Sequence, residues 1–235
     1  QLLLDWLPGA DWSWAVADGQ DIHEGDILLE IEADRTQLLS TERILLNIVG
    51  RLSGITTNTR KWSSRAHPMR VAATRKVHWG LLDKWAVHLG GGMTHRLTRA
   101  DARMLKENDL ASLALTDERL PHTVSRVLKE LDLEECGAFV EIEVRTIDEA
   151  IAAAEAWVDR MQDITDTQRL TLMLDNMDEG KAREVMLDLE TRKFRHLMVV
   201  EASGTTLIER RTSLPRSSRR LNSTAGMTIS PAIAF

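Results

Sequence analysis

The sequence predicts an α/β fold, either an α/β barrel or an open parallel sheet, that follows a smaller β-rich N-terminal part. Short apolar runs that end in polar residues recur every 27 to 35 residues, close to the ~30 residues of a strand and its crossover helix. Helical periodicity fills the stretches between them. Residues 12–33 instead alternate short apolar runs with turn residues, which is typical of small antiparallel strands. The five recurring runs begin near Val71, Arg103, Ala138, Leu170 and Leu197.

The N-terminal part is expected to contain these small strands and one helix. Turns around Gly19 and Gly25 separate the strands. Ser40 or Thr41 is the expected N-cap of the helix, which continues as an apolar stripe. Gly54 is expected either to end this helix or to allow close packing. The chain is then divided into an N-terminal β-rich domain with its connecting helix and an α/β domain, residues 1–66 and 67–235.

The polar residues that end the five apolar runs carry most of the expected chemistry. Parallel α/β folds place their active sites at the carboxyl ends of the strands, so these groups are expected to converge. Helices are expected between the strands at Pro121–Leu131, Ile147–Arg160 and Glu179–Glu190. The strand-end groups are Arg75-Lys76, Lys106-Glu107-Asn108, Glu141 with Glu143, Asp175-Asn176 and Glu201-Ala202-Ser203-Gly204.

Two carboxylates on one face of a strand need a physical reason. Period-2 alternation in residues 140–144 places Glu141 and Glu143 together on one face and three aliphatic side chains on the other. One explanation is a divalent metal, with Glu143 and Asp175 as hard oxygen ligands, directly or through water, for Mg²⁺ bound to a pyrophosphate. The other is an internal salt bridge to Lys106 or Arg75. Both can hold, because an empty site needs such pairing to avoid uncompensated buried charge.

Positive charge is concentrated in one part of the chain. Residues 43–106 contain 13 Lys or Arg and two acids, a surplus of 11 positive charges, so the remainder carries 17 negative charges to reach the net charge of −6. Such a segment attracts a polyanionic partner, either a phosphorylated metabolite or a nucleic acid. The alternative is an ordinary solvated basic face.

Composition also bears on the compartment. Cys136 is the single cysteine, which excludes an internal disulfide, and no apolar run approaches the ~20 residues of a membrane span. We therefore expect a cytoplasmic protein with no membrane partner. The chain begins at Gln1 with no cationic leader, so we expect no signal peptide and a natural start that is missing here.

Several further motifs are weak signals by themselves. Gly90-Gly91-Gly92 predicts a turn where backbone could approach a ligand, or simply a loop. Ser203-Gly204 could present backbone N–H groups to a phosphate. No nucleophile motif is present, so covalent catalysis is not expected. Six histidines show no metal-ligand spacing and are interpreted as surface or core residues: His23, His67, His78, His88, His122 and His196.

Together, these segments resemble the quinolinate phosphoribosyltransferase family, also called nicotinate-nucleotide pyrophosphorylase (carboxylating). The matching stretches follow the family's order over about residues 10–207, and their joint match is specific although no single one is. They are Thr41-Glu42-Arg43 with Leu46-Asn47, Arg51-Leu52-Ser53-Gly54-Ile55, Ala73-Thr74-Arg75-Lys76, Asp83-Lys84-Trp85-Ala86-Val87, Gly90-Gly91-Gly92, His95-Arg96, Lys106-Glu107-Asn108, Glu141-Ile142-Glu143-Val144, Leu174-Asp175-Asn176 and Glu201-Ala202-Ser203-Gly204.

The resemblance implies an incomplete α/β barrel that transfers phosphoribosyl from phosphoribosyl pyrophosphate to quinolinate with decarboxylation, giving nicotinic acid mononucleotide for NAD synthesis. It implies Mg²⁺ as cofactor, and a homodimer or higher homo-oligomer in which Arg43 reaches the neighbouring subunit's site. Catalysis is expected from Lys76, Lys106, Glu143 and Asp175. Substrate carboxylates and pyrophosphate are expected to contact Arg75, Lys76, His95, Arg96 and Lys106; ribose hydroxyls and Mg²⁺ to contact Glu143 and Asp175; and the 5′-phosphate to contact Ser203, Gly204 and Gly226.

The sequence departs from the family pattern in three places. Val77–Leu82 replaces a loop that usually supplies another arginine, Asp109 stands where a histidine is common, and residues 205–235 are arginine-rich and match only faintly. Three alternatives follow. The first is a related phosphoribosyltransferase acting on nicotinate or another carboxylated ring. The second is a nucleic-acid-binding protein using residues 43–106, which is disfavoured because no nucleic-acid-binding signature is present. The third is an inactive fragment or variant.

Overall fold

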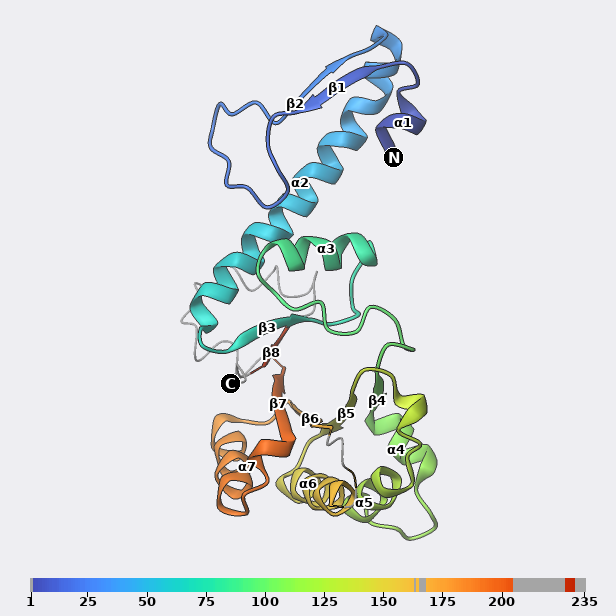
Figure 1. Ribbon diagram of the computed structural model, residues 1–235, viewed down its shortest axis with the longest axis vertical. Helices are drawn as coiled ribbons and strands as arrows, with labels where there is room; N and C mark the ends of the chain where they lie inside the picture. The colour runs from blue at the N-terminus through green and yellow to red at the C-terminus, as the bar shows by residue number, and fades with distance from the viewer. Residues whose placement is uncertain (1, 163, 165–167, 205–226, 231–235) are drawn as a thin grey trace.

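The computed structural model describes residues 2–162, 164, 168–204 and 227–230, which form a small antiparallel sheet, a long helix and a larger sheet flanked by helices (Figure 1). The small sheet pairs β1 (Asp11–Trp14) with β2 (Leu29–Glu32), which confirms antiparallel strands within residues 12–33. A short helix, α1 (Leu2–Trp6), precedes β1, and α2 (Arg35–Ala66) follows β2.

The larger sheet has the strand order β3-β8-β7-β6-β5-β4, and four consecutive neighbours in it, β4 to β7, are parallel. β8 is antiparallel to both β3 and β7. The strands β3 to β7 coincide with the five apolar runs, so the α/β class is confirmed. Their bounds are β3 Arg70–Ala73, β4 Arg103–Leu105, β5 Val140–Val144, β6 Leu170–Asp175, β7 Met198–Ser203 and β8 Met227–Ser230.

Helices cover one face of the parallel strands. In Figure 1, α5, α6 and α7 lie side by side along the strands, and α6 has contacts with both of the others. All three agree with the expected helices to within two residues. The helices of this part, with two short 3₁₀ turns, are α3 Leu81–Leu89, α4 Glu107–Leu113, α5 Leu120–Glu130, η1 Glu134–Cys136, α6 Ile147–Met161, α7 Glu179–Thr191 and η2 Arg195–Leu197.

The hydrophobic core lies between these helices and the sheet. Val140, Ile142 and Val144 of β5 are fully buried within it, and Trp157 of α6 belongs to the same cluster. Because alternate residues of a strand point to opposite faces, β5 directs its two glutamates to the other side of the sheet. The packing of β5 therefore fixes where its carboxylates point.

The start of α2 differs from the expectation. The N-cap is Asp34, whose Oδ1 accepts hydrogen bonds from the N–H groups of Thr36 (2.8 Å) and Gln37 (3.4 Å). This cap satisfies the first free N–H groups, so the helix begins before Ser40 and Thr41, and their assignment as N-cap was wrong. Gly54 lies inside the helix, with no atom within 4 Å of an added Cβ, so it neither ends the helix nor allows close packing.

The glycine triplet packs against α2. A Cβ at Gly90 would lie 2.5 Å from the carbonyl oxygen of Thr56, and one at Gly92 would lie 2.8 Å from Cγ2 of Thr59. These glycines let the end of α3 approach the long helix, which explains them without a ligand. Elsewhere, Cys136 is buried as a free thiol, and no described helix is both long and apolar enough to span a bilayer.

Candidate active site

The register of the parallel strands arranges their polar side chains in layers on the face opposite the helical core. Glu141 of β5 lies beside Thr171 of β6, and one layer nearer the carboxyl ends Glu143 lies beside Met173, which in turn lies beside Glu201 of β7. Asp175 and Ser203 form the outermost layer. The strand ends therefore bring together most of the residues expected from the sequence.

An ion-pair cluster occupies these outer layers. Nζ of Lys106 lies 2.5 Å from Oε2 of Glu143, so the internal salt bridge considered for this acid is present. Arg145 lies 3.6 Å from Glu143 and 3.3 Å from Asp175, and also pairs with Glu107. Although desolvation opposes it, the attraction of these carboxylates raises the pKa of Arg145. The cluster contains three acids and two cations.

Arg145 was missed in the sequence. The signal was present, because the alternation that aligns Glu141 with Glu143 continues to residue 145 and places its side chain on the same face. Arg75, in contrast, is exposed, and it is Arg145 that makes the ion pairs with Glu143 and Asp175 that had been considered for Arg75.

A second, more deeply buried cluster lies on the same face of the sheet. Nε2 of His95 is 3.1 Å from Oε2 of Glu141 and 3.5 Å from Oε2 of Glu201. The two carboxylates outweigh the desolvation of the ring and raise the pKa of His95 to about 9. Burial raises the pKa of Glu141, while His95 opposes that rise. Arg96, also buried, donates a hydrogen bond to the carbonyl oxygen of Ala102 (3.2 Å).

Lys84 holds the segment that carries His95 and Arg96. Its buried Nζ donates to the carbonyl oxygens of Ala73 (2.8 Å), Arg96 (3.1 Å) and Thr94. Burial, together with the nearby charges of Arg75 and Arg96, lowers the pKa of Lys84 to about 8. The lysine thus connects the end of β3 to residues 94–96. This connection explains structurally why a lysine follows Asp83.

The residue before Lys84 fixes a second segment. Both oxygens of Asp83 bind Arg51 of α2, with Nε–Oδ1 at 3.1 Å and Nη2–Oδ2 at 2.7 Å. Oδ2 also accepts from the backbone N–H groups of His78 and Trp79, and the Arg51 guanidinium lies 4.8 Å from the centre of a Trp79 ring. The divergent loop at residues 77–82 is therefore held by a bidentate ion pair.

The end of β7 lies against the end of β6. The N–H of Asn176 donates to the carbonyl oxygen of Ser203 (2.9 Å), and Gly204 has φ of +112°. A Cβ at Gly204 would lie 2.4 Å from Oδ1 of Asn176, so this position requires glycine. Ser203 and Gly204 thus adjoin Asp175, as expected.

The remaining residues expected in the site are not in the two ion-pair clusters. Arg75 and Lys76 are both exposed just after β3, and Arg75 lies near enough to Arg96 to lower its pKa, although desolvation is the larger cause. Gly226 lies outside the described residues. Arg43 is exposed near the start of α2, which projects away from the larger sheet in Figure 1. At 1.5 Å per residue it lies roughly 35 Å along α2 from the end that meets β3.

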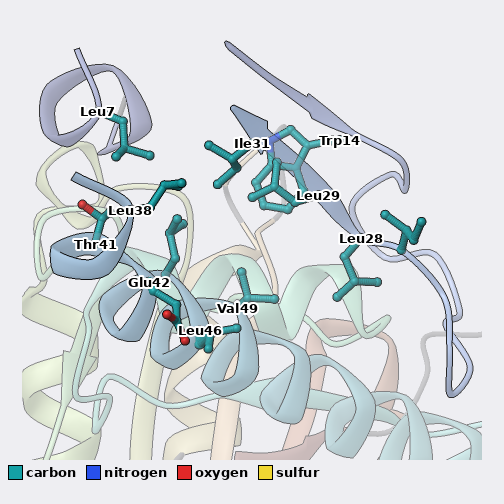
Figure 2. A pocket seen from close by; sticks show the side chains of 12 residues that line it. Leu7, Trp14, Leu28, Leu29, Ile31, Leu38, Thr41, Glu42, Leu46 and Val49 are labelled. Carbon is teal, nitrogen blue, oxygen red and sulfur yellow. The ribbon is translucent and has the colours of Figure 1, made fainter. Parts of the chain in front are cut away.

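An apolar groove runs along this projecting part of α2 (Figure 2). It has a volume of about 500 Å³ and lies between the small sheet and α2. Among the described residues that line the groove, Glu42 is the charged one, and a negative charge is unsuited to binding phosphates or carboxylates. The other lining residues are Leu7, Trp14, Ile27, Leu28, Leu29, Ile31, Leu38, Thr41, Leu45, Leu46 and Val49.

Five of the 13 basic residues in residues 43–106 are paired with an acid or buried in the protein. Arg51 pairs with Asp83, Arg60 with Asp21 and Lys106 with Glu143, while Lys84 and Arg96 are buried. A nucleic-acid interface needs cations exposed on one face. The arrangement instead suits a small anion bound at the strand ends.

Comparison with known proteins points in the same direction. Residues 55–215 match the family model of the quinolinate phosphoribosyl transferase C-terminal domain, and residues 1–53 match that of its N-terminal domain. Among solved structures, NadC from Streptococcus pyogenes superposes with a TM-score of 0.67 at 26% sequence identity, covering 91% of this chain and 70% of that one.

Curated relatives carry names from the same family. A probable nicotinate-nucleotide pyrophosphorylase [carboxylating] of Methanothermobacter thermautotrophicus is 36% identical over 80% of this chain and 63% of its own length. Quinolinate phosphoribosyltransferase [decarboxylating] 1 of Nicotiana glauca is 31% identical over 86% of this chain and 57% of its own length. The chain thus spans about three fifths of these relatives.

Proposed function

The chain belongs to the quinolinate phosphoribosyltransferase family, and on this premise we propose that it transfers phosphoribosyl from phosphoribosyl pyrophosphate to quinolinate with loss of carbon dioxide. The products are nicotinic acid mononucleotide and pyrophosphate, which places the reaction in NAD synthesis. A cytoplasmic location stays a prediction from the sequence.

The observation that carries this proposal is the meeting of cations and carboxylates at the carboxyl ends of the parallel strands. Lys106, Glu143, Arg145 and Asp175 form one continuous cluster there. Parallel α/β folds bind their ligands at this end of the sheet. A substrate with anionic pyrophosphate and polar ribose hydroxyls matches a site that offers both ammonium donors and carboxylate acceptors.

In the proposed reaction, the pyridine nitrogen attacks the anomeric carbon while the bond to the pyrophosphate oxygen breaks. The 2-carboxylate then leaves as carbon dioxide, its bonding electrons stay on the ring carbon, and that carbon takes up a proton. Lys106 leaves Glu143 to bind the departing pyrophosphate, and Glu143 and Asp175 orient the ribose hydroxyls. Catalysis then rests on positioning and on electrostatic stabilisation of developing charge, with no covalent intermediate on the protein.

Mg²⁺ belongs to the same proposal, with Glu143 and Asp175 as its protein ligands. Their carboxylates are nearly buried, with 10% and 13% of each side chain exposed, and end neighbouring strands. Mg²⁺ binds one or two carboxylates and completes its shell with water and substrate phosphates, which fits a pair of acids. The ion supplies charge stabilisation of the leaving pyrophosphate. Arg145 and Lys106 balance both acids in its absence.

We further propose a homodimer in which Arg43 completes the neighbouring subunit's site. Two features support this assignment. Arg43 is exposed on a part of α2 that projects from the larger sheet, and the apolar groove lies along the same part of the helix. Exposed groove residues such as Trp14 (49%) and Leu46 (55%) suit contact with a second copy.

Initial-rate assays with phosphoribosyl pyrophosphate test the proposed function. Quinolinate and nicotinate are compared as acceptors, each with Mg²⁺ and with a chelator. Mononucleotide should form with quinolinate and Mg²⁺, and not after chelation. Turnover of nicotinate alone would favour the related transferase without decarboxylation, and no turnover of either acid would contradict the proposal.

A further inference from the structure

Three titratable side chains from separate segments, His95, Glu141 and Glu201, meet on the face of the sheet opposite the helical core. His95 comes from the loop after the glycine triplet, Glu141 from β5 and Glu201 from β7. The exposed fractions of their side chains are 9%, 0% and 3%. The imidazole nitrogen thus lies within 3.5 Å of an oxygen of each carboxylate, and one ligand atom from each of the three residues lies within 4.8 Å of the other two.

The contacts between them are ion pairs and not well-formed hydrogen bonds. Nε2 of His95, both oxygens of Glu141 and Oε2 of Glu201 are buried, and none has a hydrogen bond of good geometry within the described chain. Buried carboxylates are costly unless a positive charge compensates them. The charge on the imidazole ring therefore decides whether this cluster is stable.

Two further groups that can carry positive charge lie close to His95 among the described residues, Arg96 and Lys84. β6, which separates the two acids, contributes Thr171 and Met173 at their register positions, and the ring of Phe139 meets the imidazole edge-on at 5.2 Å. Arg96 is attracted to Glu141, and Lys84, whose pKa is lowered to about 8, binds the carbonyl oxygens on both sides of His95. The two acids therefore lie near three groups that can carry positive charge, His95, Arg96 and Lys84.

We propose that Glu141 and Glu201 are positioning residues, which hold His95 as a fixed imidazolium whose remaining N–H binds a carboxylate of the pyridine substrate. The inference rests on the proposed function and extends it. Nε2 faces the two acids, so only Nδ1–H remains for a ligand. The pKa of about 9 supports the charged form across the neutral range. Lys84 fixes the loop on both sides of His95 through the carbonyl oxygens of Thr94 and Arg96.

This arrangement would contribute to specificity for the acceptor. A permanently charged N–H donor favours a carboxylate over a neutral group at the same place on the ring. An unassisted histidine, with a pKa near 6.5, would be mostly neutral at pH 7.5 and would lose that preference. The two glutamates thus act on the substrate only through the histidine.

The first test measures the charge of His95 without any substrate. Protein labelled with ¹⁵N-histidine is titrated by NMR, and the His95 signal is assigned by its loss in His95→Gln. We expect a pKa above 8 in the wild type and a fall of about one unit or more in Glu201→Gln. Glu184→Gln, an exposed acid of α7, is the control and should leave it unchanged.

The second test uses turnover. In Glu201→Gln, KM for quinolinate should rise by about twofold or more at pH 8, because a fall of one unit in the pKa of His95 leaves about half of the imidazole charged. KM for phosphoribosyl pyrophosphate should change little, and lowering the pH to 6 should restore quinolinate binding by protonating His95. A merely structural role would not give this recovery.

Three results would overturn the proposal. They are a His95 pKa near 6.5 in the wild type, the same pKa in Glu201→Gln, or stoichiometric Zn²⁺ binding that is lost in Glu201→Gln, since the cluster would then be a metal site. The NMR result does not depend on turnover. An enzyme inactive on quinolinate with His95 still titrating high would therefore refute the proposed function separately.

Discussion

Glu141 and Glu143 lie two positions apart on β5 and have different surroundings. Glu141 has no exposed side-chain surface and pairs with His95, whereas Glu143 is 10% exposed and pairs with Lys106 and Arg145. A shift of two residues along a strand is about 6.6 Å. This short step separates the buried cluster of His95 and Glu141 from the more exposed cluster at the strand ends.

Lys106→Ala should lower kcat/KM by at least ~100-fold, the scale of removing one preorganised charged partner from an active site. The substitution also leaves Glu143 with only the more distant Arg145 as partner. Steady-state rates with quinolinate measure the effect. Lys129→Ala is the matched control. Lys129 lies on α5, is about as exposed as Lys106 and pairs with Asp159 at 3.0 Å. Equal rates in both variants would contradict the assignment of Lys106.

The pH dependence of stability tests the His95 charge independently. Its pKa is raised from 6.5 to about 9 in the folded chain, so its contribution is fully present below pH 6.5 and is lost as the pH rises through 9. The contribution is on the order of 3 kcal/mol. The wild type should therefore lose about 3 kcal/mol of its unfolding free energy, relative to His95→Gln, when the pH is raised from 6 to 9.5.

Using the difference between two proteins removes other groups that titrate in the same range, such as Lys84. Urea unfolding at both pH values supplies the free energies. If the unfolding free energies of the wild type and His95→Gln differ by the same amount at pH 6 and 9.5, protonation of His95 does not contribute to stability.

At the scale of elements, sequence periodicity predicted most of the α/β part because burial imposes it. The five strands and the three helices that cover them were found from apolar patterning alone. The start of α2 was missed because Asp34 precedes the apolar stripe by several residues. Its capping role depends on a hydrogen bond from the N–H of Thr36, which apolar periodicity does not reveal. The glycine triplet was ambiguous because its role depends on α2, a partner distant in sequence.

Lys84 joins two of these elements, and its replacement should loosen their junction. Lys84→Met leaves three buried carbonyl oxygens without their donor, so we expect a loss of about 3 kcal/mol of unfolding free energy. Lys61→Met, at an exposed position of α2, should change it by less than about 0.5 kcal/mol. Thermal or urea unfolding compares them. Equal stability of both variants would show that the lysine does not hold residues 94–96.

Part of the candidate site could not be predicted from one sequence. The strand-end rule located Lys106, Glu143 and Asp175 together, but the partners of each charge depend on side-chain directions and register. Alternation could have added Arg145. The contact of His95 with Glu141 and Glu201 joins a loop to two strands that are not neighbours, which no local pattern encodes.

For the whole molecule, the projecting α2 predicts that one subunit alone has an incomplete site. If Arg43 serves the neighbour, mixing Arg43→Ala with Lys106→Ala subunits should create hybrid dimers that each contain one intact site. Equal mixing should restore about a quarter of the wild-type activity, since half the dimers are hybrids with one of two sites working. Activity after subunit exchange is the measurement. No recovery, with exchange demonstrated by mass spectrometry, would exclude a shared site.

The fate of the quinolinate 2-carboxylate tests the central claim most directly. Quinolinate labelled with ¹³C at this carboxylate is incubated with the protein, phosphoribosyl pyrophosphate and Mg²⁺, and labelled carbon dioxide, mononucleotide and pyrophosphate are counted. A decarboxylating transferase should produce the three in a ratio of about 1:1:1. Pyrophosphate released without labelled carbon dioxide, or a mononucleotide that keeps the label, would contradict it.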